Sequence, residues 1–143
     1  MIQVDFYVLP SGDNDSRLLF LQKLATRAIS AGLQIFIWLD NEPQARQLQE
    51  HLWRSEPEFF LPSCMPQDTI KAPILIGWLD EHLPTHSTML INLATQMAPD
   101  ANFNRIAEIV IQEPVILDTT RTRYKEYQAK GWSPSLHDMR KPS

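Results

Sequence analysis

Two hydrophobic periods alternate along the chain, and the shorter one predicts strands. Residues 2–9 (IQVDFYVL) are rich in β-branched and aromatic side chains and stop at a Pro-Ser-Gly-Asp turn, which predicts a strand. Residues 33–39 (LQIFIWL) are almost continuously apolar, a pattern typical of a parallel strand covered on both faces. Further short strands are predicted at residues 73–78, 88–93 and 105–111. We therefore expect a sheet of about five strands.

Apolar residues spaced three and four apart predict three helices in the same chain. The first begins at Asp15 or Ser16, either of which can cap it, and ends at Gly32. The second covers residues 40–53, where an Asp-Asn-Glu-Pro sequence provides a cap and a proline for the first turn. The third covers residues 112–130 and is followed by a glycine that can end it.

The order of these elements predicts a single α/β domain over residues 1–143. Right-handed crossovers would place the helices on both faces of a mostly parallel central sheet, which gives three layers. Residues 55–73 contain four prolines and no sustained period, so we expect a surface loop there. Residues 133–143 are polar and contain proline, and we expect them to form a flexible tail.

Composition and charge narrow the function classes. The single cysteine excludes an internal disulfide, and the N-terminus runs into a strand without a signal-like stretch, so we expect a cytoplasmic protein. No apolar run reaches the roughly 20 residues that cross a bilayer, so no membrane association is expected. Residues 1–120 carry seven Lys/Arg against fifteen Asp/Glu, whereas residues 121–143 carry six against two. Because the larger part is acidic, we expect no direct nucleic-acid binding over a broad face.

Signatures of catalysis and of cofactor binding are weak. The turn after the first strand (LPSGDNDS) has one glycine, too few for a dinucleotide or phosphate loop. Cys64 has no partner at a defined spacing, and Pro84 breaks the helix on which His82 and His86 would have to bind zinc. The acidic residues within 40–42 are better explained as a helix cap than as catalytic carboxylates. We therefore predict no catalytic residue, cofactor or metal.

The third predicted helix (TRTRYKEYQAKGWSP) combines basic and aromatic residues. Helical spacing places Arg121, Tyr124, Lys125 and Gln128 on one face, and Ile116, Thr120, Arg123 and Tyr127 on another. Arginine and tyrosine together suit an acidic peptide that ends in an aromatic residue and a free carboxylate. Alternatively, the tyrosines pack on the sheet and the basic residues complement the negative helix end. The spacing alone leaves both interpretations open.

A second candidate surface is the aromatic stretch WRSEPEFFLP, which contains Trp53, Phe59, Phe60 and Leu61. Large aromatic residues in a loop are either packed beneath it or exposed as anchors for a partner protein. We expect at least one of these aromatic residues to remain available.

Several segments in order, VDFYVL, LDNEPQARQLQEHLW, EFFLP and RYKEYQAKG, resemble the chi subunits of bacterial DNA polymerase III over almost the full length. The resemblance implies a Rossmann-like domain without nucleotide chemistry. It further implies a non-catalytic replication adaptor that works in the bacterial cytoplasm and reaches the nucleoid through the replisome.

The resemblance also implies two partners and their sites. Chi subunits bind the psi subunit of the clamp-loader complex and the acidic C-terminal tail of the single-stranded-DNA-binding protein. By resemblance, Arg121 holds the terminal carboxylate of that tail, which is also contacted by Arg123, Tyr124, Lys125 and Val110. The resemblance places the psi subunit on Trp53, Phe59, Phe60 and Leu61. Family members can carry a basic residue where this chain has Leu117, so tail binding is expected to be weaker or differently arranged.

Two alternatives stay open on the residues alone. A small nucleic-acid-binding module would use the basic tail and Trp132. An enzyme would need a pocket with perturbed titratable groups near Asp40 or Cys64.

Overall fold

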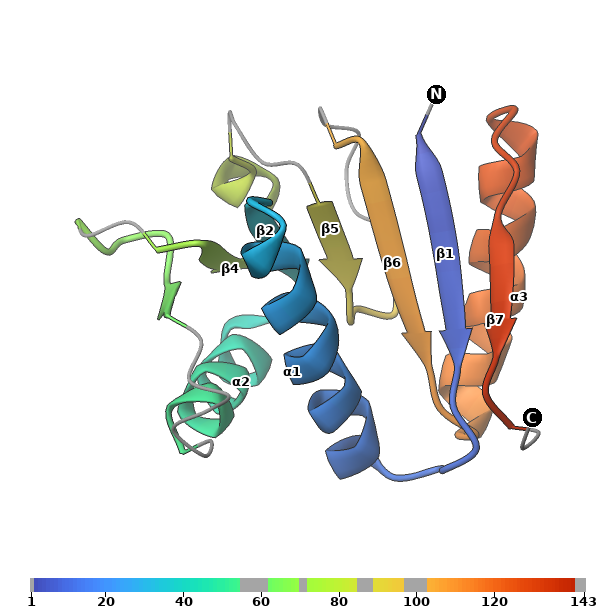
Figure 1. Cartoon of the computed structure of the whole chain (residues 1–143), viewed down its shortest axis with the longest axis horizontal. Helices are drawn as coiled ribbons and strands as arrows, with labels where there is room; N and C mark the ends of the chain where they lie inside the picture. The colour runs from blue at the N-terminus through green and yellow to red at the C-terminus, as the bar shows by residue number, and fades with distance from the viewer. Residues whose placement is uncertain (1, 55–61, 70–71, 85–88, 97–102, 141–143) are drawn as a thin grey trace.

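The computed structural model describes residues 2–54, 62–69, 72–84, 89–96 and 103–140. Its helices are α1 (Asn14–Ser30), α2 (Glu42–Trp53) and α3 (Pro114–Ala129), with a short 3-10 helix, η2 (Asp80–His82). Its strands are β1 (Gln3–Val8), β2 (Ile35–Trp38), β3 (Ser63–Cys64), β4 (Ile74–Gly77), β5 (Met89–Asn92), β6 (Arg105–Val110) and β7 (Ser135–Asp138). Within these residues all seven strands join one sheet in the order β3-β4-β2-β5-β6-β1-β7 (Figure 1).

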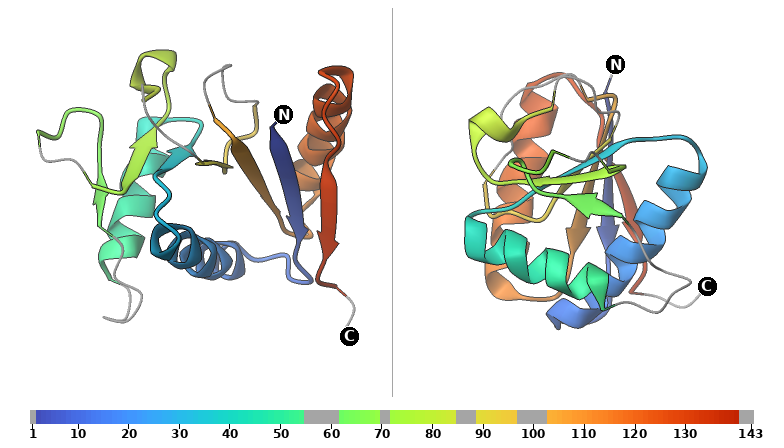
Figure 2. Two further views of the ribbon diagram at one scale, coloured as in Figure 1. Left: turned by 45° about the horizontal axis from the view of Figure 1, so that its top comes forward. Right: turned by 90° about the vertical axis from the view of Figure 1, so that its left-hand side faces the viewer.

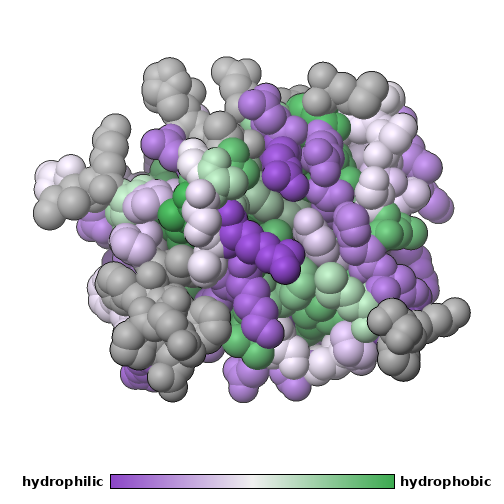
Figure 3. All heavy atoms as spheres, viewed as in Figure 1, coloured by the Kyte–Doolittle hydropathy of each residue, from purple (hydrophilic) through white to green (hydrophobic). Residues whose placement is uncertain are grey.

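Helices cover both faces of this sheet, and every strand pair in it is parallel. In Figure 1, α1 lies in front of the sheet and α3 lies behind it; Figure 2 shows α1 and α2 from two other sides. One buried cluster joins α1 and α2 to side chains such as Ile37, and a second joins Tyr127 of α3 to Phe6. Polar side chains, with small apolar patches between them, cover much of the face that carries α1 (Figure 3). The predicted three-layer, Rossmann-like α/β fold is confirmed.

The caps of the first two helices show how local sequence sets their starts. Asp13, not Asp15 or Ser16, caps α1: its Oδ1 accepts a hydrogen bond from the Ser16 backbone N–H at 2.7 Å. The prediction of that cap was wrong because the helix begins at Asn14, which leaves the two predicted residues inside its first turn. Asn41 caps α2 by accepting from the Gln44 backbone N–H at 3.0 Å.

Strand β3 was not predicted, because it lies within residues 55–73, which we expected to form a loop. It has two residues, and Ser63 pairs in parallel register with Ile74 of β4. Two residues are too few to display a hydrophobic period, so a strand of this length leaves no pattern in the sequence.

Strand β7 was not predicted, and it lies within residues 133–143, which we expected to form a flexible tail. Its four residues pair in parallel with β1, although their side chains are all exposed. His137 anchors the strand, because its Nε2 lies 2.9 Å from Oδ1 of Asp5 and its ring stacks on Tyr7 with the centroids 4.8 Å apart. The strand was missed because it buries no apolar face; the last three residues of the chain lie outside the described part.

Candidate protein-binding site on helix α3

Helix α3 has a buried face and an exposed face. Arg123 and Tyr127, four residues apart, are almost fully buried against the sheet, at 3% and 1% exposure. Arg121 and Lys125, also four apart, are exposed, and Tyr124 is half-buried. Burial thus agrees with helical spacing, which places these two sets of residues on different faces of the helix. The two arginines of the Arg-Thr-Arg sequence therefore have different roles.

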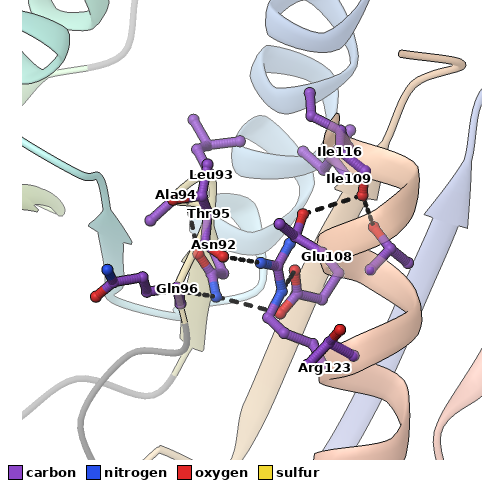
Figure 4. A network of polar contacts seen from close by, with 12 residues as sticks. Asn92, Leu93, Ala94, Thr95, Gln96, Glu108, Ile109, Ile116 and Arg123 are labelled. Carbon is purple, nitrogen blue, oxygen red and sulfur yellow. Dashed lines mark hydrogen bonds and ion pairs between the residues drawn. The ribbon is translucent and has the colours of Figure 1, made fainter. Parts of the chain in front are cut away.

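The buried face is held by the Glu108 carboxylate on β6. Arg123 Nε donates to Oε1 of Glu108 at 2.9 Å (Figure 4), and the Tyr127 hydroxyl donates to Oε2 at 2.6 Å. Asn92 Nδ2, at the end of β5, also donates to Oε2 at 3.3 Å. Arg123 Nη1 donates in addition to the Thr95 carbonyl at 3.1 Å. These contacts fix α3 over the carboxyl ends of β5 and β6.

The titration properties of this cluster follow from its burial. Burial raises the pKa of the Glu108 carboxyl above its ordinary value, and Arg123 and Tyr127, which bond to it, oppose that rise. Burial, followed by the negative charge of Glu108, raises the pKa of the Tyr127 hydroxyl as well. Tyr127 therefore remains a hydrogen-bond donor throughout the physiological pH range.

Replacing Tyr127 by phenylalanine is expected to lower the free energy of unfolding by about 1–3 kcal/mol, because a buried carboxylate loses a donor. Urea denaturation followed by circular dichroism measures the change. Tyr124→Phe is the matched control, since the Tyr124 hydroxyl makes no hydrogen bond with a described residue, and it should change stability by less than about 0.5 kcal/mol. Equal effects of the two substitutions would contradict the assigned role of the Tyr127 hydroxyl.

The exposed face of α3 presents unpaired positive charge. Neither Arg121 nor Lys125 forms an ion pair or hydrogen bond with any residue that the structure describes. Tyr124 lies between them in sequence and packs its ring against Phe6, with the centroids 5.5 Å apart. Two cationic side chains one helical turn apart, beside an aromatic ring, can bind a carboxylate and an adjoining apolar group.

Strand β7 adds an apolar residue that sequence reasoning missed. Leu136 pairs in register with Phe6, so both side chains lie on the face of the sheet that α3 covers. Leu136 is 60% exposed. We call Arg121, Tyr124, Lys125 and Leu136 together the α3–β7 surface. Leu136 could have been found from the sequence only if a strand had been predicted beyond residue 133.

Val110, a predicted contributor, and Leu117, the departure from the family pattern, both belong to the apolar packing beneath Tyr124. Val110 is buried at the end of β6, in the same apolar cluster against which Tyr124 packs. Leu117, where a family member can carry a basic residue, is half-buried and packs against that cluster as well. Val110 and Arg123 therefore support the α3–β7 surface from inside and do not form part of its exposed area.

Comparison with known proteins identifies the family of the chain. The family model described as "DNA polymerase III chi subunit, HolC" matches residues 1–135. The chain belongs to this family. A chi subunit from Pseudomonas aeruginosa is 36% identical over 99% of both chains. The Escherichia coli chi subunit is 28% identical over 93% of this chain and 95% of its own, and the Haemophilus influenzae one is 28% identical over 81% and 83%.

Membership in the chi family assigns the chain to DNA replication, as an accessory subunit of the polymerase III holoenzyme. The chi-family chain carries its second candidate surface on the other side of the sheet from α3. Trp53, the last residue of α2, is 58% exposed. Phe59, Phe60 and Leu61 lie outside the described residues. The two candidate surfaces therefore lie on helices that cover opposite faces of the sheet.

The candidate catalytic and metal-binding groups of this chi-family chain are described only in part. Cys64 is buried. His82 Nδ1 accepts hydrogen bonds from the backbone N–H groups of Trp78 and Leu79, both at 3.1 Å, and burial lowers the pKa of this histidine. His86 lies outside the described residues. In the described part of the chain, no three His, Cys, Asp or Glu side chains are grouped to hold a metal, and no helix is long and apolar enough to span a membrane.

Asp40 makes hydrogen bonds within the fold. The helix-cap interpretation of residues 40–42 holds for Asn41 and not for Asp40. Asp40 Oδ1 accepts from the Thr95 backbone N–H at 2.9 Å and from the Thr95 hydroxyl at 3.0 Å. The cap itself is Asn41, and Asp40 instead connects the end of β2 to the segment that follows β5.

Proposed function

We propose that this chain is a non-catalytic adaptor that joins the clamp loader, through the psi subunit, to the acidic C-terminal tail of the single-stranded-DNA-binding protein. The charges of Arg121 and Lys125, which have no partner in the described part of the chain, support this role most directly. They are exposed, one helical turn apart, on a helix held in place by a buried ion pair. In this role the chain works in the bacterial cytoplasm and reaches the nucleoid through the replisome.

For the tail, the α3–β7 surface supplies the two chemical features that its terminus requires. The planar guanidinium of Arg121 suits the terminal carboxylate, and Lys125 adds a second positive charge. Tyr124 and the exposed Leu136 offer an apolar area beside that charge for an aromatic residue of the tail. Arg123 acts as a positioning residue here, because its guanidinium is buried on Glu108.

For the psi subunit, the exposed Trp53 offers an anchor of the type that dominates protein interfaces. Phe59, Phe60 and Leu61 would extend this anchor along the chain. Because α2 and α3 lie on opposite faces of the sheet, we expect both partners to bind at once. A bridge of this kind raises the local concentration of the clamp loader at template coated with the binding protein, without altering any chemical step.

A nucleic-acid-binding role for the same region is less well supported. The stacking residue that it needs, Trp132, is half-buried, and its ring stacks on Tyr127 with the centroids 5.7 Å apart. Lys130 Nζ lies 5.3 Å from the centroid of the same ring. A base would have to displace one of these contacts to stack on Trp132. Binding of bare oligonucleotide in the absence of partner proteins would favour this alternative.

The bridging role is tested by capture on immobilised psi subunit, followed by addition of the single-stranded-DNA-binding protein. The chain should retain the binding protein on the psi matrix, and Trp53→Ala should weaken capture by psi about 30-fold, because a buried tryptophan anchor contributes about 2 kcal/mol or more. Leu19→Ala is the matched control, since Leu19 is an exposed apolar residue on α1 and should have no effect. Undiminished capture of Trp53→Ala, or mutually exclusive binding of the two partners, would contradict the proposal.

A further inference from the structure

A cavity of about 310 Å³ opens between the first turn of α1 and the first half of α2, outside the carboxyl ends of β2 and β5. It is separate from the α3–β7 surface and from Trp53. Four leucines form its apolar wall, and Arg17 and the side-chain amides of Asn14, Gln44 and Gln47 form its polar part. In open α/β sheets, ligands bind in crevices outside the carboxyl ends of the strands.

Arg17 is an unusual residue to find in such a wall, because it is a buried cation without an anionic partner among the described residues. It is 7% exposed and forms no ion pair with any residue that the structure describes. Nε donates to the Ile109 carbonyl at 3.0 Å, and Nη1 donates to the Leu93 carbonyl at 3.4 Å. A guanidinium has five N–H groups, and those of Nη2 bond to no acceptor among the described residues.

The acidic groups nearest to Arg17 are engaged elsewhere. Those that act on its charge are Glu108, Asp40 and Glu113. Glu108 bonds to the α3 side chains, Asp40 accepts from Thr95, and Glu113 caps α3. Burial lowers the pKa of Arg17 to about 10, so the side chain still carries its charge at neutral pH. A buried cation is costly to the fold unless it is paired, and nothing in the proposed adaptor role uses this one.

We propose that this cavity binds a small organic carboxylate, with the carboxylate on the guanidinium of Arg17 and an aliphatic body against the leucines. The planar guanidinium matches a carboxylate, and the Gln47 amide, which makes no hydrogen bond with a described residue, is available to donate to it. At about 30 Å³ per water, the cavity has room for about ten non-hydrogen atoms. A single negative charge suits the site better than a phosphate dianion, because Asp40 and Glu42 flank the start of α2.

Butyrate is a suitable probe, with butyramide as its neutral isostere and inorganic phosphate as the competing anion. Side-chain and backbone amide NMR signals of the full chain are followed at constant ionic strength. Butyrate should shift the Arg17 Nε–H and the amide of Leu93 in a saturable way, whereas butyramide should not and phosphate should bind at least tenfold more weakly. Saturation by butyramide to the same degree, or tighter binding of phosphate, would overturn the proposal.

Two variants locate the binding. Arg17→Met should abolish the butyrate shifts, but it alters a buried residue and can prevent folding. Gln47→Leu therefore provides the decisive variant, because Gln47 is exposed on α2 and its replacement should leave the thermal midpoint unchanged. Gln47→Leu should lower the affinity for butyrate at least fivefold. Lys23→Met, which removes an exposed cation from α1, is the control and should bind butyrate as the parent chain does. Parent-like binding by Gln47→Leu would overturn the proposal.

Discussion

Replacing Glu108 by alanine is expected to lower the free energy of unfolding by about 3–5 kcal/mol, because it removes one partner of a buried ion pair. The side chain is fully buried and accepts hydrogen bonds from Arg123, Tyr127 and Asn92. Its removal leaves a guanidinium and a hydroxyl buried without their acceptor, and each is then costly to keep away from water. Urea denaturation followed by circular dichroism gives the change directly.

The double variant Glu108→Leu with Arg123→Met is the control for this interpretation. It replaces the buried ion pair by apolar side chains of similar size, which commonly recovers most of the stability lost when one partner alone is removed. We expect the double variant to be more stable than Glu108→Ala by at least about 2 kcal/mol. A Glu108→Ala variant within 1 kcal/mol of the parent would contradict the role of this carboxylate in holding α3.

Replacing Arg121 by alanine is expected to weaken binding of the acidic tail peptide about 10- to 100-fold while leaving the fold unchanged. A charge-assisted hydrogen bond contributes about 1.5–3 kcal/mol, and each 1.4 kcal/mol corresponds to about tenfold in affinity. Arg121 is exposed and bonds to no described residue, so its loss should cost no stability. Calorimetric titration with the peptide measures the affinity.

Salt dependence and a matched arginine make the Arg121 result specific. Exposed charges are screened within about 8 Å at physiological ionic strength, so parent affinity should fall as salt rises and the Arg121→Ala affinity should fall less steeply. Arg27→Ala removes an exposed arginine from α1, on the other face of the sheet, and should bind the tail as the parent does. An equal loss in both variants would indicate a general charge effect and no site at Arg121.

Most of the fold could be predicted because the strands and helices that form it bury one or both faces. The strand at residues 33–39 and the helix at residues 112–130 have continuous or periodic apolar positions, and the structure contains both close to the predicted bounds. Strands β3 and β7 lack such a signal. One has two residues, and the other exposes all four side chains and is held by the pairing of His137 with Asp5, two residues far apart in the sequence.

The candidate site could be predicted only in part, since sequence spacing does not say what a side chain meets across the sheet. Arg121 and Arg123 share one short basic motif, yet one is exposed and the other lies on Glu108. The sequence did contain a signal for this pairing, because Glu108 is a carboxylate within the mostly apolar strand RIAEIV. Leu136 required knowledge of β7, and Arg17 resembled an ordinary polar residue of an amphipathic helix.

The claim that Arg121 captures the terminal carboxylate of the tail is tested most directly by comparing free and C-terminally amidated tail peptides in calorimetric titrations. Amidation should weaken binding to the parent chain about tenfold or more, and it should hardly affect binding to Arg121→Ala, because the group that recognises the carboxylate is already absent. If amidation weakens binding to both chains equally, or does not weaken binding to the parent chain, the proposed recognition of the tail by the α3–β7 surface is wrong.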